Sequence, residues 1–180
     1  MSEFRLRAWT SDDIAALPAL ANDMFVARYM TRRFPHPYLH DDAENWWGLV
    51  SQQRVQVNFA IEVDGELAGG IGLNPLDDER FGTADVGYWL GRFFWGRGIA
   101  TQALNALVRY GFDDLCMRRL QAHVMAPNIA SARVLEHAGF TFEATLPAFY
   151  VDRTNTVQDV LQYALLSSRA ESRDSHNPDS

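Results

Sequence analysis

Two glycines flank an arginine at residues 96–98, directly before a run of apolar residues with helical spacing. The first turn of a helix carries backbone N–H groups without intrahelical partners and the positive end of the helix dipole, so it attracts anions. Gly96 and Gly98 let the backbone approach such an anion without an intervening Cβ, and Arg97 adds a cation nearby. This spacing predicts a cradle for a phosphate or a pyrophosphate.

The loop differs from two common nucleotide-binding patterns. The Walker pattern GxxxxGK[ST] is absent, and the dinucleotide pattern GxGxxG would require glycine at position 101, where Thr101 stands. A GxG pair before a helix is also compatible with a tight turn into a packed helix. A nucleotide-phosphate-binding protein of another fold is an alternative, disfavoured by the missing Walker lysine and the missing metal-binding carboxylates.

Two side chains that could accept a proton lie in segments near this loop. Asp85 precedes the loop and His123 lies in a later segment of alternating apolar residues, and either could act as a general base directly or through water. Alternation places Asp85 on the opposite face of its strand from Tyr88. A structural role for His123 is favoured over that of a base, so the identity of the base stays open. The histidines and Cys116 lack metal-ligand spacing, and no metal is expected.

Apolar periodicity assigns the elements that position these residues. Alternation predicts strands at residues 4–8, 57–61, 67–73, 84–90 and 119–125, and a closing hairpin from residues 142–150 and 157–166. Helical spacing predicts helices capped by Thr10 or Ser11, starting near Asp41, following Gly98, and running from Asn128 to Gly139. Two prolines within residues 34–40 predict a loop. One domain, residues 1–167, is expected, followed by a disordered tail at residues 168–180.

Composition limits the class of protein. The formal net charge of −7 argues against a nucleic-acid partner, because phosphate recognition requires clustered Lys and Arg. This charge fits a cationic acceptor, or solubility alone. No apolar run reaches the roughly 18 residues that span a bilayer, and the N-terminal segment lacks the apolar core of a signal peptide. The single cysteine, Cys116, cannot form an internal disulfide, so a cytoplasmic protein without a membrane partner is expected.

The motifs together resemble one family. WGRGIAT, residues 95–101, is similar to the Q/R-x-x-G-x-G/A acetyl-CoA motif of the GNAT superfamily of N-acetyltransferases, and Phe93 and Trp95 flank it as in the ribosomal-protein N-terminal acetyltransferase-like (RimJ/RimL-like) branch. RRLQAHVMAPNIASARVLEHAGF, residues 118–140, resembles that branch's strand, Asn-x-x-Ser, helix and Gly-Phe pattern. DVLQYALL, residues 159–166, resembles its last strand. The resemblance covers residues 3–166.

The resemblance implies an α/β fold and a site for acetyl-CoA as cosubstrate. The fold would be a single GNAT-like domain: a strongly twisted, mostly antiparallel sheet of six or seven strands with helices on both faces. Its parallel pair, residues 84–90 and 119–125, would separate to admit acetyl-CoA. The implied cofactor-binding residues are Tyr88, Trp89 and Leu90 through their backbones, Gly96, Arg97, Gly98, Ile99, Ala100 and Thr101 at the pyrophosphate, and Asn128 and Ser131 at the pantetheine arm. The N–H of Leu90 could also polarise the thioester carbonyl.

One departure from the family pattern affects the expected chemistry. Many members place a tyrosine in the second helix to protonate the departing thiolate, and Leu135 stands there in this chain. Ser131 is the substitute candidate, through a hydrogen bond to the sulfur. Its alternative role is that of a small residue in the first turn of a helix.

Aromatic residues around the proline-containing loop are expected to line the acceptor side. Phe34, Tyr38 and Trp47, with Tyr150 from the last hairpin, are the candidates, and a core role is the alternative for each. The expected reaction is transfer of the acetyl group to a primary amine, on a protein or peptide N-terminus or a small molecule, without a covalent enzyme intermediate. A non-catalytic CoA-binding module, or an acyltransferase acting on an antibiotic or a polyamine, is the alternative. Monomer and homodimer both stay open.

Overall fold

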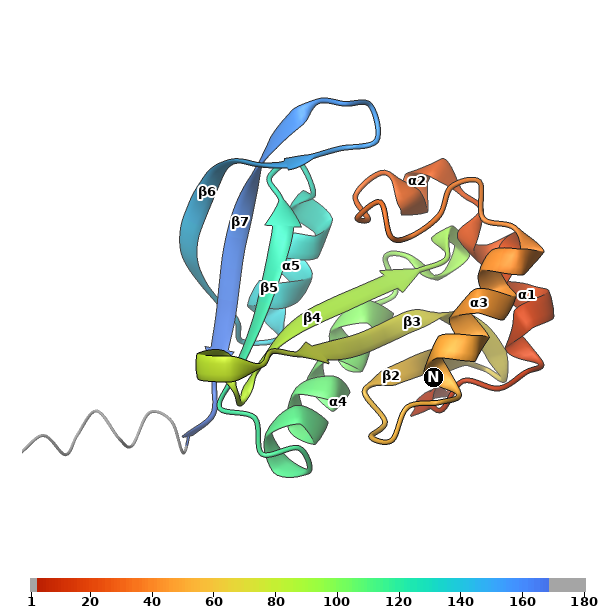
Figure 1. Cartoon of the computed structure of the whole chain (residues 1–180), viewed down its shortest axis with the longest axis horizontal. Coiled ribbons are helices and arrows are strands. Elements are labelled where there is room, and N and C mark those ends of the chain that lie inside the picture. The colour runs from red at the N-terminus through yellow and green to blue at the C-terminus, as the bar shows by residue number, and fades with distance from the viewer. Residues whose placement is uncertain (1–2, 169–180) are drawn as a thin grey trace, which may run out of the picture.

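Seven strands form one sheet in the order β1-β2-β3-β4-β5-β7-β6 in the computed structural model, which describes residues 3–168 (Figure 1). The strands are β1 Phe4–Arg7, β2 Asn58–Val63, β3 Glu66–Pro75, β4 Thr83–Leu90, β5 Arg119–Met125, β6 Thr141–Val151 and β7 Val157–Leu166. The helices are α1 Asp13–Ala21, α2 Met24–Ala27, α3 His40–Val50, α4 Ile99–Asp113 and α5 Ile129–His137, with single 3-10 turns at Asp78–Arg80 and Arg92–Phe94. All neighbouring strands are antiparallel except β4 and β5. The predicted α/β class and strand number are therefore confirmed.

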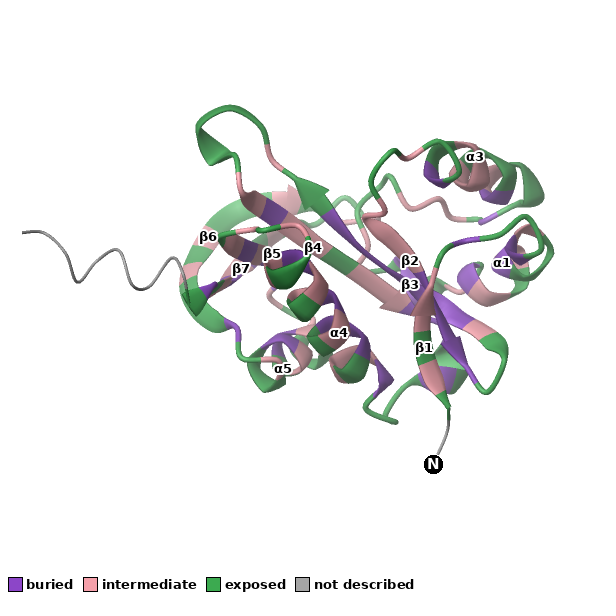
Figure 2. Cartoon of the chain, turned by 90° about the horizontal axis from the view of Figure 1, so that it is seen from below, coloured by how far each residue is buried: buried purple, intermediate pink, exposed green. Residues whose placement is uncertain are grey.

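Helices cover both faces of the sheet, and apolar residues of the sheet pack against them in two clusters (Figure 2). On one face, Ile71 and Leu120 pack with Leu104 and Leu107 of α4 and Leu135 of α5. On the other face, α1 and α3 enclose a smaller cluster, which contains Trp9, Leu17, Ala43, Val50 and Ala60. Burial of these two apolar clusters is the main stabilising contribution to the fold.

The predicted elements are present, with differences at the N-terminal side. The first helix begins at Asp13, after Asp12, and not directly after Thr10 or Ser11. The short helix α2 and the two 3-10 turns were not predicted, because elements of three or four residues contain too little sequence to show a period. The predicted tail, apart from Ser168, lies outside the described residues.

The parallel strands β4 and β5 pair over only three positions, the last of which is Asp85 with Gln121. Beyond Asp85 the two strands separate, as Figure 1 shows, while β4 stays paired with β3 as far as Leu90. The expected opening between residues 84–90 and 119–125 is therefore present. It leaves one side of the C-terminal half of β4 without a partner strand.

No helix within residues 3–168 combines the length and apolar character that crossing a bilayer requires.

Candidate active site

The loop after β4 ends in a helix start that is open to solvent. Gly96 and Gly98 have φ of 71° and 73°, the left-handed region that glycine adopts without strain. A Cβ added at either glycine would meet no protein atom within 4 Å. Gly98 is the N-cap of α4, without a side-chain cap, and the N–H of Gln102 donates to its carbonyl over 3.1 Å. The N–H groups of residues 99–101, which lie before Gln102 in the first turn of α4, are available for an anion.

Arg97, the arginine of this loop, interacts with two side chains at the surface of the protein. Arg97 places its guanidinium 5.7 Å from the ring centroid of Phe94 and 3.8 Å from a carboxylate oxygen of Asp64. The indole N–H of Trp95 donates to the carbonyl of Leu90 over 2.8 Å, which ties the loop to the end of β4. The loop is thus fixed next to the opening between the strands.

The backbone of β4 presents alternate groups to that opening. The N–H of Gly91 donates to Ala68 and the N–H of Leu76 donates to Thr83, so the hydrogen-bonded pairs with β3 fall on odd-numbered residues of β4. The N–H and C=O groups of Val86, Tyr88 and Leu90 therefore point away from β3, and after Asp85 no strand pairs with them. Apart from the Leu90 carbonyl, which accepts from Trp95, these are the donors and acceptors that an extended ligand can pair with.

Trp89 is oriented differently from its neighbours. Its backbone groups face β3 by the same alternation, and its ring lies 5.3 Å from that of Phe34, on the side of α1 and α3. A Cβ at Gly70, its partner in β3, would come within 2.9 Å of the indole nitrogen. Trp89 thus lies beside Phe34, on the face of the sheet where the acceptor is expected to bind. Tyr88 lies on the opposite face, toward α4 and α5.

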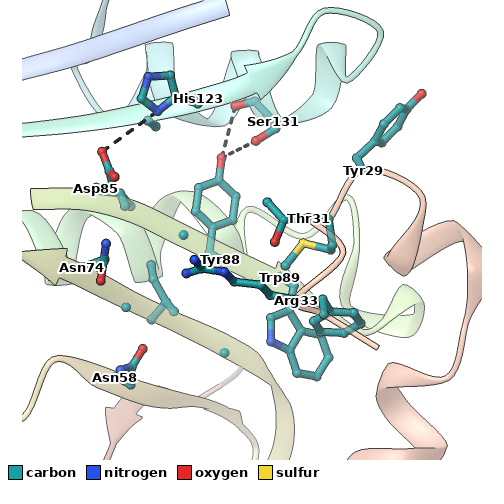
Figure 3. Close-up of a pocket in the computed structure, with 18 of the residues that line it drawn as sticks. Tyr29, Thr31, Arg33, Asn58, Asn74, Asp85, Tyr88, Trp89, His123 and Ser131 are labelled. Atoms are coloured by element: carbon teal, nitrogen blue, oxygen red, sulfur yellow. Dashed lines mark hydrogen bonds and ion pairs between the residues drawn. The ribbon is translucent and has the colours of Figure 1, made fainter. Parts of the chain in front are cut away.

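The start of α5 meets β4 through hydroxyl groups. The side chain of Asn128 caps the helix by accepting the N–H of Ser131 over 3.3 Å, which confirms the predicted cap. The amide nitrogen of Asn128 remains able to donate to a ligand. The Ser131 hydroxyl lies 2.7 Å from the Tyr88 hydroxyl, which also lies 3.2 Å from the Ser131 carbonyl (Figure 3).

Tyr88 is a candidate whose side chain the sequence reasoning missed, since it considered only the backbone. Burial raises the pKa of the Tyr88 phenol to about 12, against the smaller lowering effect of its hydrogen bond with Ser131. The phenol is therefore protonated at neutral pH and can donate a hydrogen bond. Leu135, at the position of the family's tyrosine, is completely buried in the apolar core. The signal available in the sequence was the alternation along residues 84–90, which turns Tyr88 toward the helix that carries Ser131.

A cavity of about 760 Å³ connects these groups with the acceptor side. Its lining includes residues from both faces of the sheet, so it passes through the opening between β4 and β5. Of the candidates, it is lined by Phe34, Tyr38, Asp85, Tyr88, Trp89, His123, Asn128, Ser131 and Tyr150. Trp46 lines the cavity where Trp47 was expected; Trp47 packs against the small apolar cluster. Neighbouring helix positions point in different directions, and the sequence did not indicate which of the two faces the cavity.

The two candidate bases face the same part of the cavity. The Nδ1 of His123 lies 4.0 Å from a carboxylate oxygen of Asp85, and Gln121 donates to the same oxygen over 2.8 Å. The Phe149 ring is stacked on His123 with centroids 5.9 Å apart. Burial, and then the charge of Asp85, raise the pKa of the Tyr150 phenol. An amine in this corner would meet an imidazole, a carboxylate and aromatic surfaces.

Other features of the lining concern charge and metals. Tyr38 is buried, and burial together with the charge of Asp42 raises the pKa of its phenol to about 12. Asp42 itself accepts the N–H of Leu39 over 2.8 Å at the start of α3. Within the described part of the chain, no group of three His, Cys, Asp or Glu side chains is arranged to hold a metal ion.

A glycine-flanked helix start beside a separated parallel strand pair defines the class of α/β fold to which the protein belongs. The family described as "Acetyltransferase (GNAT) domain" matches residues 3–141, and the chain belongs to this family. The sequence resemblance is thereby confirmed.

Relatives in sequence and structure agree with this family. The chain is 32% identical over 114 residues to the uncharacterized N-acetyltransferase p20 of Bacillus licheniformis, covering 63% of each chain. It is 34% identical over 98 residues to the ribosomal-protein-serine acetyltransferase of Escherichia coli, covering 54% of each. The structure of RimJ from Mycobacterium smegmatis, in complex with CoA-disulfide, superposes with a TM-score of 0.80 at 24% identity, covering 92% of this chain and 83% of that one. The matches thus span less than two thirds of these sequence relatives' own lengths.

Proposed function

We propose that the chain transfers the acetyl group of acetyl-CoA to a primary amine by direct attack, without a covalent enzyme intermediate. The observation that carries the proposal is the opening between β4 and β5. It exposes the backbone groups of Val86 and Tyr88 and the N–H of Leu90, with which no strand pairs, and lies beside the glycine cradle at residues 96–98. A chain of amide groups that ends in a pyrophosphate, as in CoA, fits these two features together.

The cradle and the strand would bind different parts of acetyl-CoA. The backbone of residues 96–101 would hold the pyrophosphate through N–H groups at the positive end of α4, with Arg97 adjacent. The backbone groups of Tyr88 and the N–H of Leu90 would pair with the pantetheine amides, and the Asn128 side chain would reach the same arm. Trp89 is left out of this set, because its backbone faces β3.

The acceptor must lose a proton for its nitrogen to attack the thioester carbon. His123 and Asp85 lie together in the cavity, and we assign His123 as the proton acceptor with Asp85 as its neighbouring carboxylate. A bond forms between nitrogen and the acetyl carbon, the bond from carbon to sulfur breaks, and the proton of the amine passes to His123.

The thiolate that leaves needs a proton or a hydrogen bond. Ser131 stays the candidate at this position, and its hydrogen bond with Tyr88 joins it to a phenol that is protonated at neutral pH. The pair would stabilise the leaving thiolate through a hydrogen bond from Ser131, which Leu135 cannot make. The buried Leu135 is also the observation that supports the second candidate, a CoA-binding module without turnover.

The remaining expectations belong to the same proposal. Phe34, Tyr38, Trp46 and Tyr150 would surround the acceptor, with Trp46 in the place first expected for Trp47. We propose a cytoplasmic enzyme, a monomer or a homodimer, that requires no metal. A nucleic-acid partner is not part of the proposal, because the net charge is −7.

The test is an acetyl-transfer screen with isotope-labelled acetyl-CoA and pools of peptides, amino acids, polyamines, amino sugars and aminoglycosides, read by mass spectrometry. Label that arrives on one class of amine supports the enzyme. Calorimetric binding of CoA with no transfer to any pool favours the binding module. Absence of both binding and transfer contradicts the proposal.

A further inference from the structure

Arg33 places a cation in the acceptor side of the cavity. It lies in the loop between α2 and α3, lines the cavity, and extends from this loop toward β4 in Figure 3. The side chain is solvent-exposed and makes no hydrogen bond or ion pair with any other residue of the described range 3–168. A charged side chain that is exposed and has no such interaction within residues 3–168 is available to a ligand.

The neighbouring arginines show that Arg33 is not needed to hold the loop. Arg32 donates to the carbonyl of Asp152, over 3.2 Å, and to the side chain of Asn155, over 2.7 Å, in the turn between β6 and β7. Arg153 of the same turn donates to the carbonyls of Ala27 and Thr31 over 2.8 and 3.1 Å. These arginines attach the loop to the hairpin, whereas Arg33 makes no such attachment.

The cation and the candidate base mark two ends of one surface. Phe34, next to Arg33, contacts Trp89 with ring centroids 5.3 Å apart. Asp85 lies four residues before Trp89, on the same face of β4. Four residues of a strand span about 13 Å. The long side chain of Arg33 brings its guanidinium closer to Asp85 than the backbone of its loop is (Figure 3). Gly87, between them, has no Cβ, and a Cβ there would meet no atom within 4 Å. An extended small molecule or chain end can lie over this glycine.

The charges of the lining favour an acceptor with both signs. Besides Arg33 and His123, the lining contains Asp85 and Asp42. Asp42 is occupied at the start of α3, which leaves the Asp85 and His123 corner for the amine. The overall charge of −7 describes the whole surface, while the ligand meets the local charges of the cavity.

We propose that the acceptor carries a carboxylate in the same molecule as its amine, with the carboxylate bound by Arg33 and the amine at His123 and Asp85. This inference rests on the proposed acetyl transfer and names its substrate class. A guanidinium binds a carboxylate through two parallel hydrogen bonds, which fixes orientation as well as charge. A polyamine would instead bring a second ammonium against Arg33, and like charges disfavour it.

The experiment compares acceptors in matched pairs, each a carboxylate and its carboxamide: free amino acids with their amides, and peptides that bear an acidic residue near the N-terminus with their neutral forms. The wild type is expected to show a kcat/KM about 10-fold or more higher for the carboxylate member. Arg33→Gln is expected to remove this preference by raising the KM for the carboxylate acceptor, with the KM for acetyl-CoA unchanged. Arg33→Lys should restore part of the preference, because it keeps the charge without the paired donors.

Arg109→Gln is the matched control, since it removes another exposed arginine, on α4 behind the opposite face of the sheet. It is expected to retain the wild-type preference. Preference among amino acids or among peptides tells which source supplies the carboxylate. Equal kcat/KM for carboxylate and amide acceptors, unchanged by Arg33→Gln, would overturn the inference while acetyl transfer stands.

A second readout separates this inference from the proposed reaction. Binding of N-acetylated amino acids and N-acetylated acidic peptides, each against its amide, can be measured by calorimetry without turnover. Weaker binding of the carboxylate forms to Arg33→Gln, with no acetyl transfer by the wild type, would support the anion site and refute the reaction. No difference between the wild type and Arg33→Gln would refute the anion site.

Discussion

The hydroxyl groups of Tyr88 and Ser131 lie 2.7 Å apart, one on β4 and the other at the start of α5. This contact joins the strand that faces the opening to the helix that follows β5. It also places a buried phenol, with a pKa raised to about 12, beside a serine that cannot act as an acid alone. The pair lies against the first turn of α5, the helix whose later position carries Leu135.

Tyr88→Phe is expected to lower kcat by about 100-fold, because Ser131 loses the partner that orients its hydrogen bond to the leaving sulfur. Ser131→Ala should lower kcat to a similar extent, and the double variant should be no slower than the slower single variant, since the two act as a unit. Steady-state kinetics gives kcat, and calorimetry should show unchanged affinity for CoA. Tyr110→Phe, which removes a hydroxyl that donates to Gln56 at the other side of the protein, is the control. Wild-type kcat in Tyr88→Phe would exclude this role.

Gly98→Glu is expected to weaken acetyl-CoA binding at least about 10-fold, because it adds bulk and negative charge at the N-cap of α4, where the pyrophosphate is proposed to bind. Gly139→Glu is the matched control: Gly139 also has positive φ, 88°, and its nearest contact to an added Cβ is 3.9 Å. Both variants carry the backbone strain, and only the first should lose affinity. Titration calorimetry measures both, and retained affinity in Gly98→Glu would refute the cradle.

His123→Gln is expected to lower kcat/KM about 100-fold with an amine that is protonated at the assay pH. The loss should shrink with a weakly basic acceptor, which is already deprotonated and needs no base. His137→Gln, on the exposed side of α5, is the control. A loss of equal size for both kinds of acceptor would indicate a structural role for His123, and Asp85→Asn would then be tested in the same way.

Arg7→Met is expected to destabilise the protein by on the order of 2 kcal/mol, because Asp13 and Glu62 are buried and lose a charged partner. Hydrogen bonds from Arg5 and Arg7 lower the pKa of Glu62; for Asp13, burial raises the pKa, but hydrogen bonds from Arg7 and Thr10 together lower it.

Lowered carboxylate pKa values stabilise the fold above the unfolded-state values, near pH 4, and this contribution disappears as the pH falls through the folded-state values. The wild type should therefore lose stability on acidification more steeply than Arg7→Met. Urea unfolding at neutral and acidic pH measures this, with the exposed Arg54→Met as control. Parallel pH profiles for wild type and variant would contradict the role of the network.

Most of the fold could be predicted because its signals are local. Alternation along residues 84–90 and helical spacing after Gly98 depend on neighbours a few positions away, and both elements are present at nearly the predicted bounds. The glycine positions predicted the helix start for the same reason, since positive φ is a property of single residues. Family motifs added the parallel pair and its separation, which the pairing of β4 with β5 confirms.

The site itself depended on contacts between distant segments. Which tryptophan of α3 lines the cavity, and whether Asp85 meets His123, follow from how α3 and β5 are placed against β4. Periodicity assigns a face to each residue of a strand, but it does not tell which loop covers that face.

The sequence by itself thus determined the class of fold, the glycine-flanked helix start and the family, because each depends on short segments of the chain. Only the tertiary structure decided that the Tyr88 hydroxyl meets Ser131, and that Arg33 enters the acceptor side from a loop more than 50 residues away in the chain. Those relationships arise when long-range packing brings separate elements together, and no local pattern of residue types encodes the distance between them.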